Sequence, residues 1–509
     1  MTHTKKQNLV SFNRRHHNKK KFYPPQCDKK LTFQDCEMAI LRASVDLAQE
    51  KIGKKTLNSE EIQNIIFILE DFLKRKGLIC YGGQAINQEL PEKDRFYNKD
   101  VEIPDYDFYS PHAMDDAKEL ADIYFAKGYD EVECKAGQHY GTYKVYVNFI
   151  PIADVTYLPM ELFQTIKKTS LRIAGILYAP PNFLKMAMYL ELSRPVGDTT
   201  RWEKVAKRLA LLNKYYPITK INCNKVSFQR HIETKYKSRE EEIFEVVRRT
   251  LIDHNVVFFG GYGISFYSQY MPKNEQKKVE EIADFDVIAR DPKTLAEIIK
   301  ERLHDIDVKE VEIVKRPPLG EVVPEQTEIR VGNEPIAVLY PPIACHSFNS
   351  INVKGDKINI ATIDTMLSFY LAFMYSNKPY YDSDRIICMA RFLYDVQQKN
   401  KLAQKGLLRR FTITCFGHQD TLEEIRGQKS EKFLELQDKK GTREYDEWFL
   451  NYRPDGKTKS KTKTKTKTRT KTKTRANTKV KTRKTKHNKT KKNINPYDIK
   501  KSFSFLPKK

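Results

Sequence analysis

The stretch Ile79-Cys80-Tyr81-Gly82-Gly83 is a short apolar run that ends in two adjacent glycines. We predict a buried strand over residues 78–81, because the run is short and its end is marked by glycine. Two glycines leave the backbone free to adopt positive φ and carry no Cβ, so a phosphate can approach the main-chain amides closely. Gly82 and Gly83 are therefore candidate phosphate-binding residues at the end of a central strand.

Three aspartates follow this turn in a pattern typical of a metal site. Asp105 and Asp107 lie in Pro104-Asp105-Tyr106-Asp107-Phe108, where a strand would point both carboxylates to one face. Asp154 has the same phase in a second apolar run, Pro151-Ile152-Ala153-Asp154-Val155. Neighbouring carboxylates repel, and Mg²⁺ (or Mn²⁺) shared with substrate phosphates would hold them together. We expect all three aspartates to be metal ligands and catalytic residues. A lone glycine pair is usually a turn and a lone Asp-x-Asp a solvated strand edge, but their order here favours a catalytic site.

The pattern recurs later in the chain. Val256-Val257-Phe258-Phe259 precedes Gly260-Gly261, and Asp284-Phe285-Asp286-Val287 begins 23 positions after Gly261, against 22 positions between Gly83 and Asp105. Pro335-Ile336-Ala337-Val338 then matches the block that contains Asp154. This ordered series predicts a duplicated domain. Because Val338 replaces the third aspartate, we expect the second copy to be a structural or RNA-holding pseudo-domain.

The net charge of +25 is concentrated at the two ends of the chain. Residues 1–30 carry +8 and residues 457–509 carry +21, which leaves −4 for the body between them. The Lys-Thr alternation of the second tail cannot bury enough apolar surface to fold, so we expect disorder and salt-sensitive binding to phosphates. A nuclear address is the competing interpretation. Without an apolar leader or a long apolar run, we expect neither a signal peptide nor a membrane span.

The cysteines predict no metal site. Eight are present, without C-x-x-C spacing and without a histidine cluster, so zinc binding is not expected. We expect reduced thiols, which would suit a protein that works inside a cell.

These observations predict an α/β (α+β) fold with two tandem domains, mixed sheets and flanking helices, plus disordered basic tails. A chain of 509 residues is too long for one core. The expected parts are a basic arm, a helical segment with the catalytic domain, a degenerate second domain, a C-terminal helical extension and a Lys/Thr-rich tail, which cover residues 1–30, 31–220, 221–400, 401–456 and 457–509.

The Tyr-Gly-Gly, Pro-Asp-Tyr-Asp-Phe-Tyr-Ser and Ile-Ala-Asp blocks resemble those of the DNA polymerase β-like nucleotidyltransferases. Two such domains in tandem, with the second degenerate, resemble the catalytic subunit of the poly(A) polymerases of poxviruses and giant DNA viruses over about residues 35–400. The gap before Asp105 is longer than is usual in the superfamily, because of a polar insertion at 90–95. The Lys-Thr tail lies outside the resemblance.

The resemblance implies template-independent transfer of AMP from ATP to the 3′ end of mRNA by two-metal phosphoryl transfer. Asp105 and Asp107 would bridge two Mg²⁺ ions, and Asp154 would hold the ion beside the attacking 3′-hydroxyl. Lys185 is a candidate cofactor-binding residue, and with the basic run 201–208 it could contact phosphate or RNA or simply be solvated. The implied partners are ATP and RNA, with no membrane and with a homodimer or a processivity partner as an option. The implied location is intracellular, in a viral factory of the host cytoplasm or in the virion.

Two alternatives remain open at this stage. Another terminal nucleotidyltransferase, uridylyl- or tRNA-end-adding, would share the same carboxylates and differ in a base pocket that the sequence does not locate. A non-catalytic RNA-binding scaffold would need both domains to be degenerate, and the intact Asp105, Asp107 and Asp154 argue against that.

Overall fold

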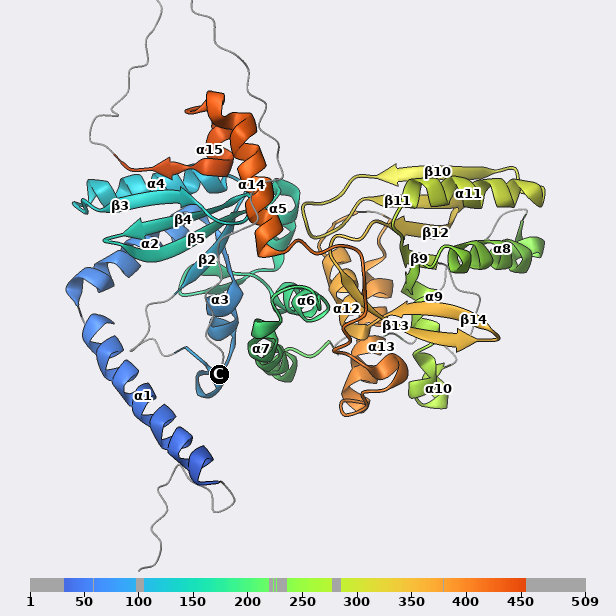
Figure 1. The fold of residues 1–509 in the computed structure, drawn as a ribbon, viewed down its shortest axis with the longest axis horizontal. Coiled ribbons are helices and arrows are strands. Elements are labelled where there is room, and N and C mark those ends of the chain that lie inside the picture. The colour runs from blue at the N-terminus through green and yellow to red at the C-terminus, as the bar shows by residue number, and fades with distance from the viewer. Residues whose placement is uncertain are drawn as a thin grey trace, which may run out of the picture. The chain divides into compact units, whose positions relative to one another are not determined.

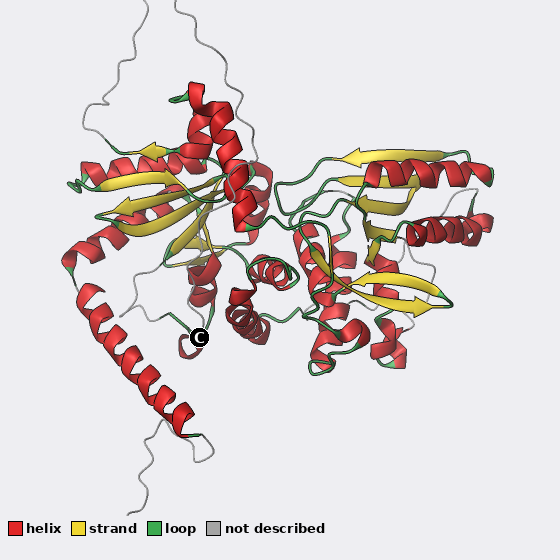
Figure 2. Ribbon diagram, viewed as in Figure 1, coloured by secondary structure: helices red, strands yellow, loops and turns green. Residues whose placement is uncertain are grey.

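The computed structural model describes residues 32–57, 59–97, 105–218, 223, 226, 236–276, 285–378 and 380–454 (Figure 1). These residues form two eight-stranded mixed sheets with helices packed around them (Figure 2). The α/β class with two tandem sheet domains is thereby confirmed. Both basic tails, residues 1–30 and 457–509, lie outside the described residues. Among the described helices, none is both long enough and apolar enough to span a bilayer.

The first sheet has the strand order β16-β3-β4-β5-β2-β1-β7-β6. Its strands are β1 (Ile79–Tyr81), β2 (Tyr106–Ser110), β3 (Val132–Ala136), β4 (Thr142–Val147), β5 (Ile150–Tyr157), β6 (Leu171–Ile173), β7 (Ile176–Tyr178) and β16 (Asn451–Tyr452). The helices of this part are α1 (Phe33–Leu57), α2 (Glu60–Lys76), α3 (Gly82–Glu89), α4 (Ala113–Ala126), α5 (Met160–Thr169), α6 (Pro181–Leu192), α7 (Trp202–Tyr215), α14 (Leu422–Leu436) and α15 (Arg443–Phe449).

The second sheet has the order β10-β11-β12-β9-β8-β14-β13-β15. Its strands are β8 (Val257–Phe259), β9 (Phe285–Ile288), β10 (Val311–Arg316), β11 (Gln326–Val331), β12 (Glu334–Tyr340), β13 (His346–Val353), β14 (Asp356–Ala361) and β15 (Cys415–Phe416). Its helices are α8 (Glu240–Asp253), α9 (Gly260–Ser265), α10 (Lys273–Gln276), α11 (Pro292–Asp305), α12 (Ile363–Phe373) and α13 (Ser383–Lys399).

Seven strands of the two sheets correspond one to one. The series β3-β4-β5-β2-β1-β7-β6 matches β10-β11-β12-β9-β8-β14-β13, and every adjacent pair has the same parallel or antiparallel sense in both. Shared topology of this length confirms the predicted duplication. The exact domain boundaries remain predictions.

The glycine pair is delivered to the sheet by an amphipathic helix. The buried stripe of α2 consists of Ile62, Ile65, Leu69, Phe72 and Leu73. The helix ends at Gly77, whose φ of +62° lies in the left-handed region that glycine adopts without strain. Strand β1 follows, with Ile79 and Cys80 fully buried, so the predicted strand lies in the middle of the first sheet.

The two halves contact each other through helices and a main-chain bond. Helices α6 and α12 pack together, with the rings of Phe183 and Tyr375 edge-on at a centroid distance of 5.3 Å. The amide of Ser347 donates to the carbonyl of Ser193 over 2.9 Å. The C-terminal extension returns to the first sheet, where β16 pairs with β3.

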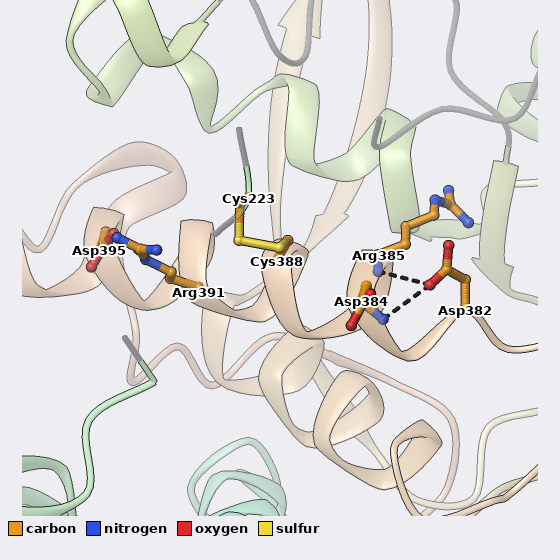
Figure 3. The surroundings of a disulfide bond; sticks show 7 residues. All are labelled: Cys223, Asp382, Asp384, Arg385, Cys388, Arg391 and Asp395. Carbon is orange, nitrogen blue, oxygen red and sulfur yellow. Dashed lines mark hydrogen bonds and ion pairs between the residues drawn. A yellow bond between two sulfur atoms is a disulfide. The ribbon is translucent and has the colours of Figure 1, made fainter. Parts of the chain in front are cut away.

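The prediction of reduced thiols is wrong for several cysteines. Cys223 is bonded to Cys388 on α13 (Figure 3), and Cys345 is bonded to Cys415. Figure 3 shows Cys388 on helix α13. The N-terminus of this helix is capped by Asp382, whose side chain accepts hydrogen bonds from the amides of Asp384 and Arg385. The bonded cysteines are 165 and 70 residues apart in the chain, so local spacing could not reveal the pairs. Cys80 and Cys134 are free and buried.

Candidate active site

Four side chains form a row across the first sheet, beside the glycine turn. The strand registers pair Tyr81 with Asp107, Asp107 with Asp154, and Asp154 with Lys144. Directly paired residues on neighbouring strands project to the same face. The structure therefore brings two of the predicted aspartates side by side and adds a lysine that the sequence analysis did not identify. The alternation of strand β4 shows only that Lys144 faces away from the core; its position opposite Asp154 depends on the pairing.

Asp105 lies just before β2, two residues from Asp107 and on the same face. Burial and, to a smaller extent, the negative charges of Asp105 and Asp154 raise the pKa of Asp107 to about 7. Burial and Asp154 also raise the pKa of Asp105, while Lys144 and Lys204 oppose that shift. Ionisation of Asp105 and Asp107 is therefore disfavoured at this site.

The glycine turn and Asp107 are in close contact. Gly82 has a φ of +69°, and a Cβ built on it would lie 2.5 Å from Oδ2 of Asp107. A larger residue would displace the carboxylate as well as strain the backbone. Gly82 and Gly83 open helix α3, and no side chain caps its first amides. Free amides at a helix N-terminus are a common site for phosphate groups.

Arg208, the last residue of the basic run predicted at 201–208, lies against the turn. A Cβ on Gly83 would meet Oη of Tyr97 at 2.5 Å and Nη1 of Arg208 at 3.0 Å. Arg208 donates through Nη2 to Tyr97 Oη over 2.8 Å, and its guanidinium lies 4.4 Å from the ring centre of Phe96. Among the described residues, no carboxylate forms an ion pair with Arg208. The basic run predicted at 201–208 therefore brings an uncompensated guanidinium to the glycine turn.

Asn87 on α3 and the polar insertion at 90–95 hold the segment that carries Tyr97. Asn87 accepts hydrogen bonds from the amides of Phe96 and Tyr97 over 2.8 and 2.9 Å, and Asp94 accepts from Lys214 on α7 over 2.8 Å. The insertion thus ties α3 to α7. Two further cations of the basic run act on the carboxylates: Arg201 lowers the pKa of Asp107 and Lys204 that of Asp105, against the net upward shifts.

Lys185 needs a correction. It is fully buried on α6, and its Nζ donates to the carbonyl oxygen of Tyr216 over 2.6 Å. Burial lowers its pKa to about 7, opposed by the charge of Glu89, whose own pKa burial raises to about 8. An ammonium group held in this interior cannot reach a phosphate at the glycine turn without leaving its partner. The structure places Lys185 in the packing between α3 and α6 instead.

The chemistry of the three carboxylates fits a divalent cation. Three carboxylates on one sheet face, beside free amides, are the oxygen donors that Mg²⁺ and Mn²⁺ prefer. The three aspartates are not the group of possible metal ligands that lie closest together within the described ranges. That group, whose ligand atoms all lie within 4.8 Å of one another, consists of His418, Asp420 and Glu424. His418 and Glu424 of that group are exposed, and Glu424 already closes the capping box of α14. Asp154 is bound to Lys144, so convergence of the three aspartates requires this ion pair to open.

The second sheet shows what the duplicated site has lost. Its registers pair Phe259 with Asp286, Asp286 with Val338, and Val338 with Glu328. Val338 therefore occupies the place of Asp154, as the sequence alignment proposed, and Glu328 the place of Lys144. Asp286 and Glu328 are buried, at 5% and 4% exposure. Asp284, the other carboxylate of the predicted pair, lies outside the described residues.

Glu328 is bound to cations of its own. Nε of Arg316 and Nε of Arg330 lie 2.7 and 2.5 Å from its carboxylate oxygens. Although burial raises the pKa of Glu328, these hydrogen bonds bring it below the ordinary value. Two guanidinium groups already neutralise this buried carboxylate, and their positive charges would repel a divalent cation. On the corresponding face of the second sheet, ion pairs of Glu328 with two arginines therefore take the place of a metal site.

Comparison with known proteins places these features among viral enzymes. Residues 67–198 match the family model described as poly(A) polymerase catalytic subunit. The chain is 32% identical over 171 residues to the putative poly(A) polymerase catalytic subunit of African swine fever virus (isolate Tick/Malawi/Lil 20-1/1983), covering 32% of this chain and 36% of that protein. It is 35% identical over 162 residues to the protein of the same description from Acanthamoeba polyphaga mimivirus, covering 31% and 27%. The matched segment thus spans about a third of the length of these relatives.

The structural match is more extensive. The crystal structure of the Megavirus polyadenylate synthase superposes with a TM-score of 0.67 at 22% identity, over 80% of this chain and 85% of that one. The two proteins share a fold. The segment 67–198 contains the glycine turn, the three aspartates and Lys144. In sequence over this segment the chain is similar to viral proteins described as putative poly(A) polymerase catalytic subunits, and over most of its length it shares the fold of the Megavirus polyadenylate synthase.

Proposed function

We propose that this protein is a polynucleotide adenylyltransferase that adds AMP from ATP to the 3′ ends of mRNA without a template. The observation that carries the proposal is the strand register that sets Asp107 beside Asp154 on one face, next to the Gly82-Gly83 turn and Asp105. All of these residues lie in the segment that matches the poly(A) polymerase catalytic subunit family.

The carboxylates would hold the divalent cation, Mg²⁺ or Mn²⁺. When bound, such a cation neutralises phosphate charge and lowers the pKa of a hydroxyl group. Asp105 and Asp107 face the triphosphate side, beside the glycine turn, and Asp154 faces the 3′-hydroxyl. The hydroxyl oxygen of the RNA attacks the α-phosphorus of ATP, the bond to the β-phosphate breaks, and pyrophosphate leaves.

The phosphates of ATP would be bound by the glycine turn and its cationic neighbour. The amides of Gly82 and Gly83 open α3 and are free to donate. Arg208 lies against Gly83 and can exchange its hydrogen bond to Tyr97 for a bidentate contact with a phosphate. This contact replaces the one expected of Lys185.

The second sheet would support the first without reacting. Its corresponding face lacks the third carboxylate and is filled by the Glu328 ion pairs, which supports a structural or RNA-holding role. The basic tails would add nonspecific affinity for RNA. The proposal includes a homodimer or a processivity partner, and a location in a viral factory of the host cytoplasm or in the virion, where the related viral enzymes would meet mRNA.

The test is an extension assay. The full-length protein is incubated with a short RNA and each of the four NTPs separately, with Mg²⁺ or Mn²⁺, beside Asp107→Asn. We expect extension with ATP that the variant loses. Extension with UTP alone, or with CTP and ATP on tRNA ends only, would identify one of the alternative transferases, and the absence of extension with every NTP would leave the RNA-binding scaffold.

A further inference from the structure

The strongest unexplained feature of the site is the lysine at the end of the row. Lys144 and Asp154 are direct partners on antiparallel strands β4 and β5, so their side chains project together. Nζ of Lys144 forms a hydrogen-bonded ion pair with Oδ2 of Asp154. The side chains are 38% and 22% exposed, so a solute can reach both. The pair is formed at the carboxylate that we assign to the 3′-hydroxyl side.

The charge balance of the row explains why a cation is needed there. Three carboxylates lie on one face, and their negative charges repel one another. Lys144 forms an ion pair with Asp154 and lies on the face that carries the other two carboxylates. It is therefore a counter-ion for the whole cluster.

The second half of the chain offers an internal comparison. At the place of the Asp154–Lys144 pair it has Val338 and Glu328, in the same register. The third carboxylate and the lysine are thus missing together. The lysine is present where the third carboxylate is present and absent where it is absent, so the comparison links Lys144 to Asp154.

We propose that the ammonium group of Lys144 pairs with the carboxylate of Asp154 in place of a divalent cation and leaves it when the cation binds. Lys144 thereby sets the cation concentration at which the site fills. The inference rests on the proposed metal-dependent function. A flexible four-carbon stem allows the ammonium group to swing to solvent without moving the strand. Because the ammonium group and a divalent cation repel each other at one carboxylate, removal of the lysine charge should tighten divalent binding.

The test measures binding of Mn²⁺ to the full-length protein by the loss of the free-ion signal in electron paramagnetic resonance. Only binding that Asp154→Asn removes is counted. Lys144→Met and Lys144→Gln remove the charge, and Lys144→Arg keeps it. The matched control is Lys135→Met, because Lys135 is the partner of Lys144 on β3 but pairs with Glu133.

We expect both neutral variants to bind Mn²⁺ at least fivefold more tightly than the unmodified protein, and to gain more in melting temperature when Mn²⁺ is added. Lys144→Arg and the Lys135 control should stay within twofold of the unmodified protein. Unchanged or weaker binding in the neutral variants, with Asp154-dependent binding still present, would overturn the role of Lys144 alone. If no variant shows Asp154-dependent binding, the metal site and the proposed function are overturned with it.

Discussion

The charge cluster makes a quantitative prediction for Asp107→Asn. The folded, metal-free protein raises the pKa of Asp107 from its ordinary 3.8 to about 7. Because the folded state holds this proton more tightly than the unfolded state does, ionisation of Asp107 destabilises the fold. The penalty is absent below pH 3.8, grows as the pH rises, and is complete above about pH 7. Asparagine carries no charge and escapes the penalty.

The magnitude follows from the slope of this linkage. Each pH unit between the two pKa values adds about 1.4 kcal/mol to this penalty. Without solvent screening, the penalty would therefore grow by about 2.5 kcal/mol between pH 5 and pH 8. Solvent screening of the half-buried carboxylate reduces this figure, and we expect about 1–2.5 kcal/mol. Asp107→Asn should therefore gain that much in free energy of unfolding, relative to the unmodified protein, when the pH is raised from 5 to 8.

The assay is urea unfolding in EDTA at the two pH values, followed by tryptophan fluorescence. The chain has two tryptophans, and both report on the first half. Trp202 on α7 donates to the carbonyl of Glu191, and Trp448 lies 4.5 Å from the ring centre of Tyr140. The matched control is Asp130→Asn, an exposed aspartate in the loop after α4. An Asp107→Asn difference that is the same at both pH values, or that falls at pH 8, would refute the electrostatic account of the site.

Three further predictions concern ATP, the second half and the tail. Arg208→Met should raise the KM for ATP about tenfold in a steady-state extension assay, equivalent to about 1.4 kcal/mol. The exposed control Lys207→Met should leave the KM unchanged, and equal effects of the two substitutions would remove Arg208 from the ATP site. Asp286→Asn should keep the extension rate within about threefold of normal, while Asp154→Asn should lower it at least a hundredfold, and an equally deep loss in Asp286→Asn would mean that both halves take part in catalysis. Deletion of residues 457–509 should weaken RNA binding and flatten its dependence on salt in a filter-binding titration, and an unchanged salt slope would show that the tail binds something other than RNA.

Some features could be predicted because the sequence encodes them locally. The strand before Gly82 follows from a short apolar run that ends in two glycines, and Asp105 and Asp107 share a face because strand residues alternate. The duplication and the loss of the third carboxylate at Val338 follow from two ordered sets of blocks, and the register of β9 and β12 places Val338 where the alignment did.

Other features depended on which strands and helices become neighbours. Lys144 is a counter-ion only because β4 pairs with β5 in one register, and a shift of one residue would have turned it to the other face. Lys185 seemed available on a helix, but α6 buries it against α3. The bond from Cys223 to Cys388 joins residues 165 positions apart.

The amino-acid sequence by itself determined the chemistry that this protein carries: the glycine turn, the three carboxylates and their loss in the second copy. Periodicity and turn residues act over a few positions, and a sequence displays them directly. Only the tertiary structure decided the electrostatic environment of that chemistry, namely which cation neutralises Asp154, which guanidinium lies against Gly83 and which lysine is buried. Those assignments depend on contacts between segments that are distant in the chain, and these contacts exist only once both sheets have formed.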